Sequence, residues 1–150
     1  MDMSLYLVKT RGAGGSGGNE EEGGRMRVYV AGKYSDDNVL GVLGNIARGI
    51  HLCKRLFLMG HAPFCPWLDH QYVLHMTDEE RKSLTVSMFH DYSLQWLDVS
   101  DCVLVIPDRI ETSRGVQNEI ARAKELNIPV FYSMEEMYDY EHGLSEVFRG

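Results

Sequence analysis

Short apolar runs alternate with stretches of helical periodicity along this chain, and this alternation narrows the possible folds sharply. The runs lie at residues 26–31, 61–66, 102–107 and 128–133. The run 102–107 is the clearest strand and 128–133 the last central one, whereas Pro63 and Pro66 mark 61–66 as edge-like or irregular. Strands joined by helices of about twelve residues form right-handed βαβ units. We therefore expect a single Rossmann-like α/β domain, with a parallel sheet of about five strands flanked by helices.

The segments between these runs predict the helices. Val39, Leu43, Ile46, Ile50 and Phe57 recur at helical spacing and predict a helix to about Met59, with Gly60 as its cap. Further helices are predicted from a start at 77–80, over about 83–97, from the N-cap Ser113 to Asn127, and over 134–140. We expect residues 67–78 to form a long loop.

Residues 11–24 read RGAGGSGGNEEEGG and cannot bury apolar surface. We therefore expect residues 1–24 to form a flexible, disordered tail and residues 25–150 to form the domain.

Charge and composition limit the partners. The net charge of −7 argues against a nucleic-acid polymer, which needs a basic face, but not against one small phosphorylated ligand. No apolar run reaches 18 residues, so no membrane helix is expected. Three widely spaced cysteines are no disulfide framework and favour a reducing, cytoplasmic setting.

Three polar segments follow the predicted strands, at residues 32–35, 66–72 and 108–119. Parallel sheets bind ligands outside the carboxyl ends of their strands, so these segments should converge on one site. Outside the Gly-rich segment 11–24 the chain has no GxGxxG or Walker motif, and no cofactor is expected. The pattern predicts a small-molecule site, with a nucleotide or nucleoside as its ligand.

Glu119 and the segment Ser113-Arg114-Gly115 are the chief candidates for chemistry. A carboxylate in the second turn of a helix after a strand should be kept ionised and suits attack on an anomeric carbon. A hydroxyl, a cation and free N–H groups at a helix start suit an anion, with Lys33 and Ser35 as further contacts. The plainer interpretations are a surface glutamate paired with Arg122 and a simple helix cap.

A zinc site is a weaker interpretation. His61, Cys65, His70 and His75 follow one another at intervals that match no familiar ligand pattern, so no metal is expected.

The chain resembles the nucleoside 2-deoxyribosyltransferase superfamily, which includes the nucleoside 5′-monophosphate N-glycosidases. The segments that carry the resemblance are VYVAG (28–32), PWLDHQY (66–72), SLQWL (93–97) with Ser100 and Asp101 after it, and SRGVQNEI (113–120). Each is short, but their order and spacing over residues 26–133 are specific for the fold. The resemblance also implies a homodimer or a larger homo-oligomer.

The resemblance implies a role for each matching position. Glu119 corresponds to the nucleophile that forms a glycosyl-enzyme, and Tyr29 to an aromatic residue beside it. Serine at position 113, where the transferases carry aspartate, favours a 5′-phosphorylated substrate. The other implied substrate-binding positions are Gly32, Lys33, Ser35, Ser93, Arg114, Gly115 and Asn118.

One position departs from the family pattern. Ser93 replaces an aspartate that orients the sugar and supplies a proton to the leaving base, and Asp91 points elsewhere on the helix. Asp69 or His70 is the predicted replacement acid. We therefore expect a nucleoside or nucleotide N-glycosidase or a deoxyribosyltransferase, with a non-catalytic nucleotide-binding or sensor module as the alternative.

Overall fold

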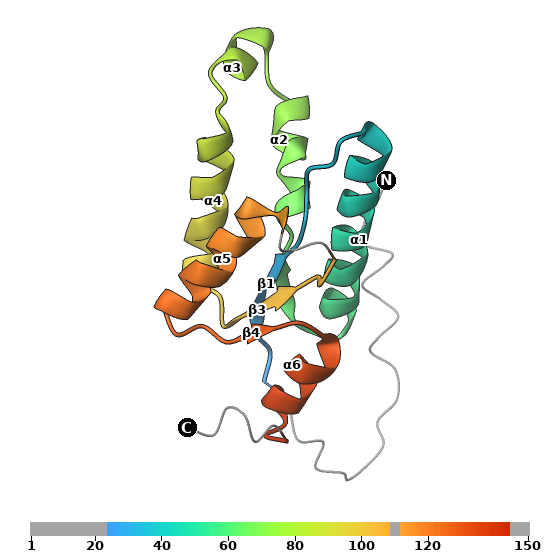
Figure 1. The fold of residues 1–150 in the computed structure, drawn as a ribbon, viewed down its shortest axis with the longest axis vertical. Helices are drawn as coiled ribbons and strands as arrows, with labels where there is room; N and C mark the ends of the chain where they lie inside the picture. The colour runs from blue at the N-terminus through green and yellow to red at the C-terminus, as the bar shows by residue number, and fades with distance from the viewer. Residues whose placement is uncertain (1–23, 109–111, 145–150) are drawn as a thin grey trace, which may run out of the picture.

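The computed structural model describes residues 24–108 and 112–144. Its centre is a four-stranded parallel sheet of order β2-β1-β3-β4. The strands are β1 (Arg27–Ala31), β2 (Ala62–Phe64), β3 (Cys102–Val105) and β4 (Val130–Phe131). Figure 1 shows the sheet between α1 on one side and α4 and α5 on the other. The predicted α/β class and parallel pairing are confirmed.

The strands alternate between two cores, as a sheet buried on both faces requires. Val28, Val30 and Leu104 pack in one core, together with Leu56 of α1 and Met137 of α6. The intervening strand residues pack in the other core, against α4 and α5; they are Tyr29, Ala31, Val103 and Val105. Neighbouring residues of β1 thus serve opposite faces of the domain.

The helices are α1 (Val39–Leu58), the 3₁₀ turn η2 (Pro66–Leu68), α2 (His70–Leu74), α3 (Asp78–Lys82), α4 (Val86–Asp98), α5 (Arg114–Glu125) and α6 (Met134–Glu141). Their ends follow local chemistry. Asn38 caps α1, and Thr77 with Glu80 forms a capping box on α3. Gly60 and Asn127 follow α1 and α5 with φ of 92° and 57°, which confirms the predicted ends.

Most of the residues whose spacing predicted α1 lie outside its buried face, although Ile46 packs against the core. Val39, Leu43 and Phe57 are 69%, 55% and 70% exposed. The buried stripe runs instead through Asn45, Gly49, Cys53 and Leu56. Apolar residues lie on both sides of this helix, so its periodicity predicted a helix without selecting the face that packs on the sheet.

Three other expectations need correction. About five strands were expected, but the described residues form four, because each of the four apolar runs supplies one strand and the long connection from β2 to β3 adds none. The run 128–133 was expected as a central strand, yet β4 lies at an edge, as β2 does. The predicted loop 67–78 contains η2 and α2, whose residues His70–Leu74 carry no strong capping signal.

The connection from β2 to β3 extends beyond the sheet, with α2, α3 and α4 at the top of Figure 1 and α6 near the opposite end. Most of the predicted tail, residues 1–23, and residues 109–111 lie outside the described residues. None of the helices over 24–108 and 112–144 is both long and apolar enough to cross a membrane.

Candidate active site

A cleft of about 570 Å³ opens at the carboxyl ends of the strands. The strand order reverses between β1 and β3, which is where doubly wound sheets bind ligands. The three polar segments expected to converge do so here, within the described residues. Every predicted site residue lines this cleft except Tyr29; the lining ones are Gly32, Lys33, Ser35, Asp69, His70, Ser93, Ser113, Arg114, Gly115, Asn118 and Glu119.

Tyr29 lies beneath the cleft and orients Glu119. Its side chain is fully buried, and its hydroxyl donates a 2.7 Å hydrogen bond to Oε1 of Glu119. Ser93 of α4, which is 7% exposed, also hydrogen-bonds to Tyr29, and the Phe64 ring stacks on Tyr29 at 5.4 Å. Burial and the neighbouring carboxylate raise the pKa of Tyr29, so the phenol stays a hydrogen-bond donor.

Burial raises the pKa of Glu119 from 4.5 to about 7, although the Tyr29 hydrogen bond lowers it in part. This corrects the expectation that the helix start keeps the carboxylate ionised. Glu119 is the sixth residue of α5, and the helix field falls off within the first turn, so desolvation dominates. The surface-glutamate interpretation is also wrong, because Arg122 pairs with Asp98 and Glu125.

Trp67 forms one wall of the cleft and is 1% exposed. Two glycines make room for its ring: a Cβ at Gly49 would lie 2.2 Å from the indole, and one at Gly32 would lie 2.7 Å from it. The indole Nε1 donates a 3.2 Å hydrogen bond to the Lys33 carbonyl. Gly32 therefore serves the packing of Trp67, a role that sequence reasoning did not assign to it.

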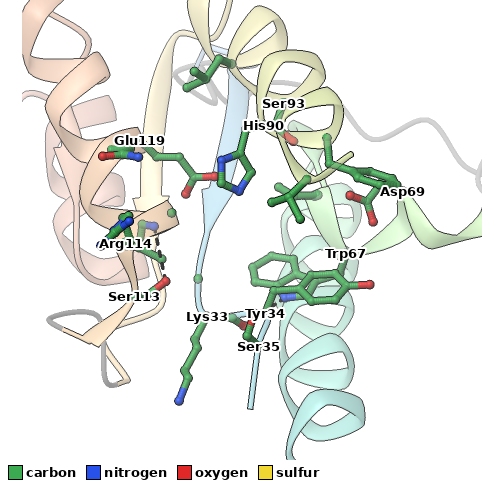
Figure 2. A pocket seen from close by; sticks show the side chains of 18 of the residues that line it. Lys33, Tyr34, Ser35, Trp67, Asp69, His90, Ser93, Ser113, Arg114 and Glu119 are labelled. Atoms are coloured by element: carbon green, nitrogen blue, oxygen red, sulfur yellow. Dashed lines mark hydrogen bonds between the residues drawn. The ribbon is translucent and has the colours of Figure 1, made fainter. Parts of the chain in front are cut away.

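The loop after β1 is held by a residue that the motifs did not indicate. Asn45 of α1 is 3% exposed, and its Nδ2 donates to the carbonyls of Tyr34 and Ser35 at 3.1 and 3.3 Å. Lys33 pairs with Asp36 at 3.9 Å and points away from Glu119 (Figure 2).

The start of α5 forms the opposite wall. Ser113 is the N-cap, since its Oγ accepts a hydrogen bond from the Val116 N–H at 3.4 Å, as predicted. A Cβ at Gly115 would meet no atom within 4 Å, so the backbone there stays open to a ligand. Arg114 is exposed at the cleft. The arrangement suits an anion at this end of the cleft.

The structure distinguishes the two residues predicted as the acid, Asp69 and His70, by their contacts. His70 Nδ1 contacts the Trp67 carbonyl and its Nε2 lies 3.0 Å from the Gln71 amide, so both ring nitrogens are engaged. Asp69 is half-buried on the cleft wall, and burial raises its pKa. Because both ring nitrogens of His70 are already engaged by neighbouring groups, the geometry favours Asp69 over His70 as the acid.

One face of α4 completes the cleft, and sequence reasoning missed most of it. The lining residues of α4 are Val86, Phe89, His90, Ser93 and Leu94. These residues recur at helical spacing and therefore share one face of α4, and this spacing is the sequence signal that could have identified them. Figure 2 shows the His90 ring directed toward the Glu119 carboxylate.

The four residues of the zinc hypothesis are not brought together. His61 is buried beside Glu141, with 3.6 Å between Nε2 and Oε2, whereas His70 lines the cleft. Within residues 24–108 and 112–144, no group of three or more His, Cys, Asp or Glu side chains is placed to hold a metal ion.

A model of the family described as "Domain of unknown function (DUF7768)" matches residues 26–133, which include the whole sheet and every element of the cleft. None of the curated proteins matches the chain.

Proposed function

Because this chain belongs to the DUF7768 family, whose description names no activity, we propose a function from its cleft. The protein cleaves or transfers the N-glycosidic bond of a nucleoside or a (deoxy)nucleoside 5′-monophosphate, with Glu119 as the nucleophile. The resemblance of its motifs to the nucleoside 2-deoxyribosyltransferase superfamily supports this assignment. The parallel α/β sheet is consistent with the Rossmann-like domain that this resemblance implies.

The observation that carries the proposal is the contact between Glu119 and Tyr29. A half-buried carboxylate lines a cleft and accepts a 2.7 Å hydrogen bond from a fully buried phenol. Such a bond leaves the second carboxylate oxygen for attack on C1′ and fixes its direction. With a pKa of about 7, an appreciable fraction of Glu119 is ionised at neutral pH.

The two ends of the cleft differ in character, which supports a nucleotide as the ligand. Ser113, Arg114 and Gly115 offer a hydroxyl, a cation and helix N–H groups to a 5′-phosphate. Phe89 and Leu94, which are both partly exposed, supply apolar surface that suits the flat face of a base. A cleft of about 570 Å³ lies within the usual range for small-molecule sites.

Asp69 is the proposed acid. In the first step Glu119 attacks C1′, the C1′–N bond breaks, and Asp69 gives its proton to the departing base. Asp69 lies half-buried on the cleft wall, and burial shifts its pKa upward, which is the direction that proton donation requires.

A nucleotide-binding module without turnover is the second candidate. Ser93, at the position where the resemblance expects an aspartate, is 7% exposed and is engaged with Tyr29. A serine has no carboxyl proton to give to a leaving base, and this favours a site that binds a nucleotide without turnover.

The test incubates the protein with ribo- and deoxyribonucleoside 5′-monophosphates and the matching nucleosides, followed by chromatography for the free base. Base release by the wild type and none by Glu119→Gln is the expected result. Thermal stabilisation by the same ligands with no base released would contradict the enzyme and favour the binding module.

A further inference from the structure

The cleft contains an imidazole that the proposed first step does not use. His90 lies on α4 one turn before Ser93 and is exposed at the cleft. Within the described part of the chain, it has no hydrogen-bond or ion-pair partner besides those of the helix backbone. Imidazole is the side chain best suited to accept and return protons near neutral pH.

The His90 imidazole is placed where it could act on a molecule bound to Glu119. Glu119 extends from α5 and His90 from α4, and the two side chains point toward one another (Figure 2). A sugar bound covalently to Glu119 would present the far side of C1′ to the α4 wall. A water molecule that attacks C1′ must approach from this far side.

We propose that His90 is the general base that activates water against the glycosyl-enzyme, which makes the protein a hydrolase instead of a transferase. This inference rests on the function proposed above, because it concerns the second step of that reaction. It divides proton transfer between two residues: Asp69 acts on the leaving base and His90 acts on the incoming water.

The step balances without another reactant. The water oxygen forms a bond to C1′ while its proton passes to a ring nitrogen of His90. The bond between C1′ and the Glu119 oxygen breaks, and its electron pair returns to the carboxylate. His90 then releases the proton to solvent, and the products are the sugar 5′-phosphate and the free enzyme.

His70 is less suited to this role, although it lines the same cleft. Its two ring nitrogens are engaged by the Trp67 carbonyl and the Gln71 amide. The remaining histidine at the cleft is His90, within the lining residues that the structure describes.

The experiment compares the wild type with His90→Gln by rapid quenching, using the monophosphate that the wild type cleaves best. His90→Gln should release about one base per protein in a fast burst and then turn over roughly 10²–10⁴-fold more slowly. Mass spectrometry should find the sugar phosphate on the peptide that contains Glu119. Azide attacks C1′ without a base, so it should restore turnover and yield the glycosyl azide.

His51→Gln is the matched control, because His51 is exposed on α1 outside the cleft, and it should behave as the wild type. Unchanged turnover in His90→Gln would overturn the inference, as would a slower burst that azide does not rescue. Base exchange faster than hydrolysis in the wild type would also overturn it. A wild type that releases no base would instead refute the proposed function itself.

Discussion

At the scale of single residues, Glu119 illustrates a conflict between stability and reactivity. Its carboxyl is desolvated at the cleft, which favours the neutral form, while the proposed chemistry requires the ionised form. The Tyr29 hydrogen bond offsets part of this cost, because it stabilises the carboxylate. Strongly shifted ionisable groups are typical of functional sites for this reason.

Glu119→Gln should therefore stabilise the protein in a pH-dependent way. The pKa of about 7 in the folded state exceeds the ordinary value of 4.5, so the wild type loses stability as the pH rises through this window. Glutamine does not titrate. We expect the free energy of unfolding of the variant to exceed that of the wild type by about 1–3 kcal/mol at pH 8 and by much less at pH 4.5. Denaturant titrations at both pH values measure this, and an equal difference at both would contradict the raised pKa.

Ser113→Asp tests the phosphate end of the cleft. Aspartate is as good an N-cap as serine, so α5 should be retained. The new carboxylate should repel a 5′-phosphate and lower kcat/KM for monophosphates by about 10–100-fold. The values for nucleosides should hardly change. An equal loss for nucleosides and monophosphates would place the phosphate elsewhere.

At the scale of elements, α1 and η2 are coupled through the indole of Trp67. Gly49 lies in the buried stripe of α1 and accepts the ring, which in turn binds the carbonyl of Lys33 in the loop after β1. The shape of this wall therefore depends on a glycine in the middle of a helix, where glycine otherwise weakens the helix.

Gly49→Ala and Gly44→Ala form a matched pair on α1. The new Cβ at position 49 would lie 2.2 Å from the indole, so we expect a loss of about 1–3 kcal/mol and altered tryptophan fluorescence. At position 44 the Cβ meets no atom within 4 Å, and the variant should gain about 0.5–1 kcal/mol. Thermal and denaturant unfolding measure both. Similar effects of the two substitutions would refute the role of Trp67.

At the scale of the whole molecule, the two ends of the sheet carry different chemistry. The carboxyl ends hold the polar cleft, whereas a buried contact between His61 and Glu141 lies near the start of β1. There the Met26 N–H donates to Nδ1 of His61 at 3.3 Å, which leaves the ring proton on Nε2, facing Glu141. The pair joins the chain before β2 to the end of α6, with side chains only 4% and 8% exposed.

His61→Ala should therefore lower stability without damaging the cleft. It leaves the Glu141 carboxylate buried without its partner, and we expect a loss of about 2–4 kcal/mol in the free energy of unfolding. Adding Glu141→Gln should recover part of this loss in a double-mutant cycle. Base release under conditions where the protein is folded should stay the same. Additive effects of the two substitutions would show that the pair is not coupled.

The parallel sheet and the position of the cleft were predictable from the sequence, because both follow from local patterns. Apolar runs such as 102–107 pair in parallel when helices separate them, and parallel strands end at one edge. The convergence of the segments around Gly32, Asp69 and Ser113 follows from that geometry alone. The caps at Ser113 and Thr77 depend on nearby residues and were visible for the same reason.

Only the tertiary structure decided which face of α1 is buried, how tightly Glu119 holds its proton and where His90 points. Each depends on residues far apart in the chain. Gly49 packs because Trp67 needs its space, and the pKa of Glu119 reflects burial in a cleft beside Tyr29 of another element. Periodicity and capping report contacts within a few residues, whereas shape complementarity and desolvation arise only after distant segments have packed together.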